Sequence, residues 1–252
     1  MWTVVGEALS GSGRMVLEPL QSVGESLKWE KQKKADWLGS GQEMETISTW
    51  SPNFWRKDLE EKLMQYMTAQ IPLFGSSSST DDTALNQHLS QLETTFLPSL
   101  EYSSDVFKEA GLLITYSHCC HASLSSHIST LTGSNHFSFS QGLLVYEWGL
   151  KMYKSGSETC LRPRQTTQHD LSLGVQSFMW IILKTEEQLL AVTQKEVEKN
   201  LKEAFDIGKP PCADAAVVQI LTEKTEAAWR VSKSLSEKVE SVCLEEFLRF
   251  LE

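Results

Sequence analysis

The sequence lacks the features of a secreted, membrane-spanning or nucleic-acid-binding protein. Its 252 residues include only five cysteines, an odd number that fits reduced thiols better than a disulfide scaffold. The longest apolar run, 178–183, is far shorter than the ~20 residues that span a bilayer. The start has no basic segment followed by a long apolar one, so we expect no signal peptide. The formal net charge of −10 argues against a nucleic-acid partner.

Motifs of the common enzyme classes are missing as well. No glycine-rich phosphate loop, zinc-protease motif or nucleophile elbow occurs. The paired carboxylates at 60–61, 186–187 and 245–246 are adjacent in sequence, so on a helix they point in different directions and are typical of solvated faces. We therefore expect no enzymatic activity, no catalytic residue and no cofactor.

What the sequence does contain is helical periodicity, whereas the alternation typical of strands is hard to find. Helices are predicted over 14–37, 52–71, 81–98, 102–132, 138–153, 169–206 and 212–251. The predicted apolar stripes comprise Leu20, Val23 and Leu27 in the first helix and Trp55, Leu59, Leu63, Tyr66 and Met67 in the second. Pro98 is expected to interrupt the third of them. The pattern predicts an all-α fold of long antiparallel helices in stacked bundles that form an elongated rod. We expect a helical bundle over 1–153, a loop or linker over 154–168, and a second, incomplete bundle over 169–252.

The most regular apolar pattern lies in 102–132, where most residues at spacings of three and four are small or apolar. The predicted packing seam comprises positions 106, 110, 113, 117, 120, 124, 127 and 131. Eight tryptophans are many for this length, and filling the gaps between long helices is the simplest explanation for them. We predict that Trp148 and Trp229 belong to the core, and leave Trp2, Trp29 and Trp37 open as partner anchors.

One short segment has the residue types of a metal site. Residues 118–121 read His-Cys-Cys-His, and His127 follows. On a helix these side chains fan around most of the circumference, and only Cys120 and His127 share a face. A structural role is therefore favoured, and no metal ligand is assigned. The alternative is a helical-bundle metal-binding protein that uses the His118–His127 cluster with a remote ligand such as Cys243 or His169.

Three segments, taken in order, form a recognisable pattern. They are Trp29 and Trp37 with 51–55; 120–128 with Leu143, Leu144, Trp148 and Tyr153; and the helix that carries Ala228, Leu235, Val239, Cys243, Leu244, Phe247 and Leu248. Together they resemble the exocyst complex component 3 family, nearest the branch with tumour necrosis factor alpha-induced protein 2 and the exocyst component 3-like proteins. In this chain Cys120 replaces an aromatic residue of the pattern, Ile128 replaces a leucine, and Trp148 is displaced by a residue or two.

The resemblance implies a non-enzymatic scaffold for vesicle tethering and exocytosis. Its implied partners are exocyst subunits, SNARE proteins and a Ral-type small GTPase, with peripheral contact at the plasma membrane from the cytoplasm. The motifs describe packing, so they name no protein-binding residue. Members of the family are considerably longer, and we expect this chain to be a shortened form or a fragment. A third interpretation is a functionally silent fragment that exposes apolar surface where missing bundles would pack.

Overall fold

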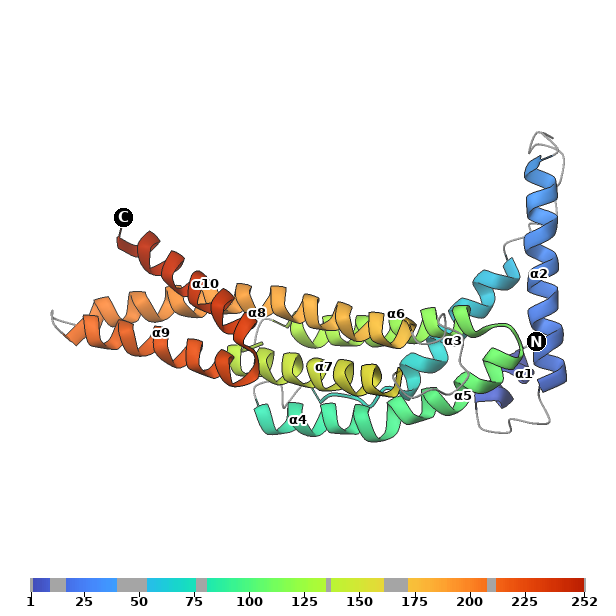
Figure 1. Ribbon diagram of the computed structural model, residues 1–252, viewed down its shortest axis with the longest axis horizontal. Coiled ribbons are helices and arrows are strands. Elements are labelled where there is room, and N and C mark those ends of the chain that lie inside the picture. The colour runs from blue at the N-terminus through green and yellow to red at the C-terminus, as the bar shows by residue number, and fades with distance from the viewer. Residues whose placement is uncertain are drawn as a thin grey trace. The chain divides into compact units, whose positions relative to one another are not determined.

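The computed structural model describes residues 2–9, 17–39, 54–75, 81–134, 137–160, 172–207 and 212–251 (Figure 1). The helices are α1 (Trp2–Leu9), α2 (Leu17–Gly39), α3 (Phe54–Gln70), α4 (Asp82–Gln91), α5 (Leu97–Glu109), α6 (Leu113–Thr132), α7 (Phe139–Cys160), α8 (Ser172–Ile207), α9 (Cys212–Val231) and α10 (Lys233–Leu251). A short π-helical segment, η3 (Leu92–Phe96), joins α4 to α5. These ranges contain no strand, so the predicted all-α fold is confirmed for them.

The described residues form two compact units. Unit 1 comprises Met1–Leu73, Ser90–Ser126 and Thr166–Gly174, and unit 2 comprises Phe74–Leu89, His127–Gln165 and Val175–Glu252. This division differs from the predicted bundles over 1–153 and 169–252, because α7 shares a core with α8, α9 and α10. Helix α7 also extends to Cys160, so 154–160 is helical and not part of a loop. The remaining stretch, 161–168, lies outside the described residues.

The apolar stripes of α2 and α3 form the centre of unit 1. The predicted stripe of Leu20, Val23 and Leu27 is buried on α2, and Leu59, Leu63 and Met67 are buried on α3. Each buried side chain of this size contributes about 1.5–3 kcal/mol. The same cluster contains Val5, Ala8, Phe107, Ala110, Leu112, Tyr116 and Cys119. Five helices therefore share this core.

The predicted continuous helix over 102–132 is wrong, because the chain turns between α5 and α6. Gly111 has φ +71°, a left-handed conformation that favours glycine. Its N–H donates to the Lys108 carbonyl at 3.0 Å, and the Leu112 N–H donates to the Phe107 carbonyl at 2.8 Å. These two bonds form a Schellman motif, which satisfies carbonyls that the end of α5 leaves free. The following helix starts in a new direction at Leu113.

After the turn, the buried positions of α6 differ from the predicted seam by up to one residue, although Leu124 is buried as predicted. The rings of Phe107 and Tyr116 stack with centroids 4.5 Å apart, on opposite sides of the turn. Farther along α6, Cys119 and Ile128 are buried, whereas the predicted seam residue Cys120 is half-buried. Because the predicted seam was continued through the turn, it placed Cys120 in the core instead of Cys119.

Pro98 does not interrupt the helix that begins at α4, contrary to the prediction. The Leu97 N–H donates to the Leu92 carbonyl, five residues back, which is the π-helical spacing. Pro98 then lies in the first turn of α5, where its missing N–H is tolerated. The chain consequently stays helical from Asp82 to Glu109.

Unit 2 has its core where α7 meets α8, α9 and α10. The fully buried side chains of α8, α9 and α10 include Leu189, Val197, Leu201, Ala228, Leu235 and Val239. Phe139 and Tyr146 of α7 complete this cluster. Two ion pairs tie α8 to the other helices, one between Lys224 and Glu196 and one between Lys238 and Glu186, each with an N–O distance of 2.5 Å.

The predicted helix over 212–251 is likewise two helices, which meet at Ser232. The Ser232 side chain accepts from the Leu235 N–H at 3.5 Å, at the start of α10. Helix α10 then returns toward α9 (Figure 1), and the Ser236 hydroxyl donates to the Thr225 carbonyl at 3.1 Å. Within the described residues, none of the helices is both long and apolar enough to cross a membrane.

Candidate functional site

The two adjacent cysteines of α6 belong to unit 1, Cys119 buried and Cys120 half-buried. The Cys119 thiol lies 3.7 Å from the Glu60 carbonyl oxygen of α3, and Cys120 packs against the same core. Burial raises the pKa of Cys119 to about 11 and that of Cys120 to about 12. Because the thiolate is the nucleophile and the metal ligand, both side chains act as small apolar groups at neutral pH.

The two histidines of the same segment, His118 and His121, are less buried than Cys119. His118 is exposed, whereas His121 is half-buried, with Nδ1 3.3 Å from the Ser125 hydroxyl. Burial and the neighbouring His118 lower the pKa of His121. The helix thus distributes the four polar side chains of 118–121 around its circumference, as its geometry requires.

No group of three or more histidine, cysteine, aspartate or glutamate side chains in the described ranges could hold a metal ion. Cys243, one of the remote ligands considered, is buried in the core of unit 2. His169, the other, lies outside the described residues. The described part of the chain therefore gives no support to a metal centre built from the His118–His127 cluster.

The structure instead joins His127 to a histidine that the sequence patterns did not select. His127 Nε2 lies 2.8 Å from Nε2 of His88 on α4, within unit 2. His88 is buried on the same face as Leu85 and Leu89. The sequence could have indicated His88 by its spacing, because a histidine three residues after a buried leucine falls on the apolar stripe of the helix.

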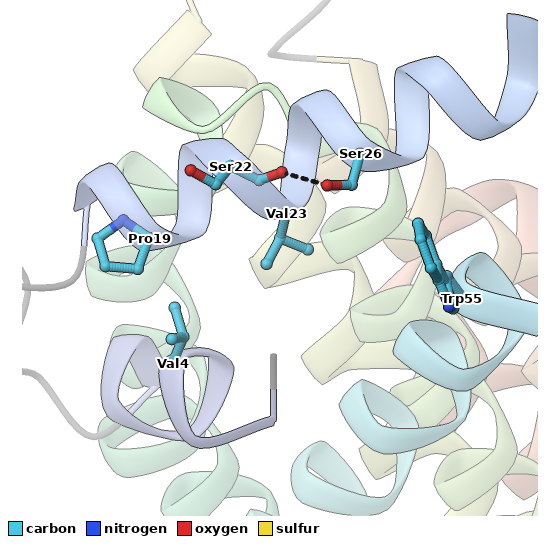
Figure 2. A pocket seen from close by; sticks show the side chains of 6 residues that line it. All are labelled: Val4, Pro19, Ser22, Val23, Ser26 and Trp55. Atoms are coloured by element: carbon cyan, nitrogen blue, oxygen red, sulfur yellow. Dashed lines mark hydrogen bonds between the residues drawn. The ribbon is translucent and has the colours of Figure 1, made fainter.

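A hollow of about 540 Å³ opens in unit 1 between α1, α2 and α3 (Figure 2). Its lining residues are Val4, Pro19, Ser22, Val23, Ser26 and Trp55. Trp55 lies across from Ser26 and is 42% exposed, although its spacing placed it on the buried stripe of α3. The Ser26 hydroxyl donates to the Ser22 carbonyl at 2.8 Å. The hollow thus offers apolar surface and two hydroxyls but no ionisable group.

Large apolar side chains are exposed on the helices of unit 2 at helical spacing. Leu244 and Leu248, four residues apart on α10, are 48% and 61% exposed, and we call this pair the α10 ridge. Glu240 and Glu245 beside the ridge are exposed carboxylates. A second pair with the same spacing, Met179 and Leu183, is exposed on α8.

The tryptophans divide between core and surface. Trp148 is buried as predicted, and its ring meets that of Phe178 edge-on with centroids 5.9 Å apart. Trp229 is 57% exposed, so its predicted place in the core is wrong. Trp29 is half-exposed, and the side chains of Trp2 and Trp37 lie outside the described residues.

Two charged side chains of unit 2, Glu246 and Lys224, have partners on neighbouring helices. Glu246, which is buried, accepts from the Gln194 amide at 2.6 Å and from the Arg249 guanidinium. Lys224 pairs with Glu196 and also lies 4.4 Å from the centroid of the Phe139 ring. These contacts join helices to one another, as buried charges do when their hydrogen bonds are satisfied.

Comparison with known proteins gives no match: no family model, no curated protein and no solved structure is significantly similar to this chain.

Proposed function

We propose that this chain is a non-enzymatic helical scaffold that binds other proteins, of the kind found in the exocyst complex component 3 family, and that it acts in vesicle tethering at the plasma membrane. The single observation that carries the protein-binding part is the α10 ridge. Leu244 and Leu248 project from a helix whose opposite face packs on the core through Leu235, Val239 and Cys243.

Such a ridge has the spacing with which helices pack on one another. Residues four apart form one row on a helix surface, and such rows fit into the grooves of a neighbouring helix. Helical partners present matching apolar rows in helix-to-groove recognition. The exposed carboxylates of Glu240 and Glu245 at the edge of the ridge favour a partner with basic residues beside its apolar row.

The partner class rests on the resemblance to the exocyst family. Exocyst subunits and SNARE proteins are the partners that it implies, and a Ral-type small GTPase is the third. Contact with the plasma membrane would then be peripheral and indirect, through the partner proteins.

The test is an affinity capture with the full chain as bait, from cytosol and from detergent-solubilised membranes, at low and high salt. Exocyst subunits and SNARE proteins are then identified by mass spectrometry. We expect them at both salt concentrations, because an apolar ridge is less sensitive to screening than surface ion pairs. Replacement of Leu244 and Leu248 by serine should remove the captured proteins.

The matched control replaces Met179 and Leu183 by serine, which removes an equally spaced exposed pair from α8. The control should retain the partners. Equal loss in both double variants would place binding outside the α10 ridge. A well-folded chain that captures neither exocyst subunits nor SNARE proteins would contradict the tethering function itself.

A further inference from the structure

Two histidine rings face each other in unit 2, one from α4 and one from α6. The Nε2 atoms of His88 and His127 are 2.8 Å apart, and the ring centroids are 5.0 Å apart. His88 is only 3% exposed and His127 is half-buried. The ring of Phe74 lies against His88 with a centroid distance of 5.2 Å. The pair is thus a buried polar contact between two helices, with an aromatic ring against one member.

A nitrogen–nitrogen distance of 2.8 Å is that of a hydrogen bond, which fixes the protonation of both rings. One Nε2 must carry a hydrogen and the other must offer a lone pair, so at least one ring is neutral. Addition of one proton at the donor ring's Nδ1 keeps this bond but places a charge in a buried site. Addition of a second proton removes the acceptor and sets two positive charges against each other.

The charged groups around the pair do little to offset such charges. Helix α6 contains no Asp, Glu, Lys or Arg, and on α4 the carboxylate of Asp82 is exposed at the first turn, next to exposed Asp81. Burial, with the neighbouring His88, lowers the pKa of His127 to about 4, and burial alone lowers the pKa of His88. Among the described groups, no carboxylate contributes to either shift.

We propose that His88 and His127 form a proton-sensitive latch, which holds α4 against α6 while the rings share a hydrogen bond and releases α4 when both rings are protonated. In the open form each ring is solvated and binds a proton near its ordinary pKa of 6.5. In the closed form the pKa values are lower. The closed form is therefore fully favoured above pH 6.5 and loses this advantage as the pH falls toward 4. Each pH unit in that window raises the ratio of open to closed molecules by up to tenfold for each additional proton bound.

The first measurement is NMR of the full chain with ¹⁵N-labelled histidine. At neutral pH we expect His88 and His127 in opposite tautomers, one with hydrogen on Nε2 and one with hydrogen on Nδ1. In a titration toward pH 4 both rings should protonate well below pH 6.5. Protonation of both near pH 6.5, or the same tautomer in both, would overturn the latch without any variant.

The second measurement is amide hydrogen exchange across 82–89, corrected for the intrinsic pH dependence of exchange. Between pH 6.5 and 4.5 the corrected opening of this segment should increase at least tenfold in the natural chain. In the double variant His88→Gln, His127→Gln it should be nearly constant. The variant His118→Gln is the control, because it removes an exposed histidine of the same helix, and it should behave like the natural chain.

Equal pH dependence in the natural chain and the double variant would overturn the proposal. Zn²⁺ supplies a further test at neutral pH. If added Zn²⁺ slows exchange in the natural chain but not in the double variant, the pair is a metal site and not a latch. If Zn²⁺ has no effect on either, the latch stands. If the double variant does not fold, the NMR tautomers and the histidine titration of the natural chain are sufficient to test the latch.

Discussion

At the scale of single residues, burial accounts for most of the stability that Trp148 contributes. Its ring is 6% exposed and packs on Phe178. The indole Nε1 is buried, and none of the described residues accepts a hydrogen bond from it, so the contribution of this side chain is apolar packing reduced by this unsatisfied donor. We expect Trp148→Ala to lower the free energy of unfolding by about 3–5 kcal/mol. Denaturant unfolding followed by circular dichroism measures this change.

Trp229 provides the control for that variant. It is 57% exposed, so Trp229→Ala should cost no more than ~1 kcal/mol. A cost for Trp229 equal to that for Trp148 would mean that α9 packs more tightly around the indole than the structure shows.

The burial of the thiols leads to a second prediction at this scale. Cys119, Cys120 and Cys243 are buried or half-buried, and burial raises the pKa of Cys243 to about 11. Few thiolates are therefore present at pH 7, and alkylation should be slow. We expect iodoacetamide with peptide mapping to label these three cysteines at least tenfold more slowly in the native chain than in urea. Rapid native labelling of Cys120 would show that its side of α6 opens to solvent.

At the scale of elements, the contact between α2 and the α5–α6 turn depends on a glycine. A Cβ at Gly24 would lie 2.3 Å from the Ala110 carbonyl oxygen, which is backbone. Alanine normally stabilises a helix interior by about 0.5–1 kcal/mol relative to glycine. At Gly24 we expect the opposite sign, because α2 must move away from the turn. Thermal unfolding of Gly24→Ala should therefore show a lower midpoint.

Gly6 on α1 is the matched control, because a Cβ there would have nothing within 4 Å. Gly6→Ala should raise the stability by about 0.5–1 kcal/mol. If Gly24→Ala also raises the midpoint, α2 does not approach the turn as closely as the structure shows.

The elements also show what the sequence could predict. The stripes Leu20–Leu27 and Leu59–Met67 were predicted correctly, because burial on one helix follows directly from a spacing of three and four. The turn at Gly111 and the break at Ser232 were missed. In both places small residues continue the helical spacing. The change of direction is visible only in the structure, where Gly111 has a positive φ and α9 ends at Val231. At Pro98 the error was the reverse, because a break was predicted and the chain stays helical. The prediction did not consider the π-helical spacing before this proline.

Contacts between distant segments were beyond the sequence patterns. Nothing near His127 selects His88, since the pair depends on which face of α4 meets α6. The exposure of Trp229 has the same origin, because its spacing fits a packed face but no helix of the described residues covers it. The metal hypothesis could be weighed from helix geometry alone, which spreads 118–121 around the axis. The exocyst resemblance remains a prediction.

At the scale of the whole molecule, the two compact units predict that stability is not uniform along the chain. Leu63 is fully buried in the core of unit 1, and Val239 is fully buried in the core of unit 2. We expect Leu63→Ala to cost about 2–5 kcal/mol and to accelerate hydrogen exchange chiefly in α1, α2 and α3. Val239→Ala should cost less, because fewer atoms are removed, and should accelerate exchange chiefly in α8, α9 and α10.

The measurement is exchange followed by mass spectrometry on the full chain, with each variant compared with the natural sequence at the same pH. Helix α6 is the informative segment, because the boundary between the units falls within it, after Ser126. Its first half should respond to Leu63→Ala and its second half to Val239→Ala. Uniform acceleration along the chain in both variants would mean that the units unfold as one cooperative body, since additive local effects require independent packing.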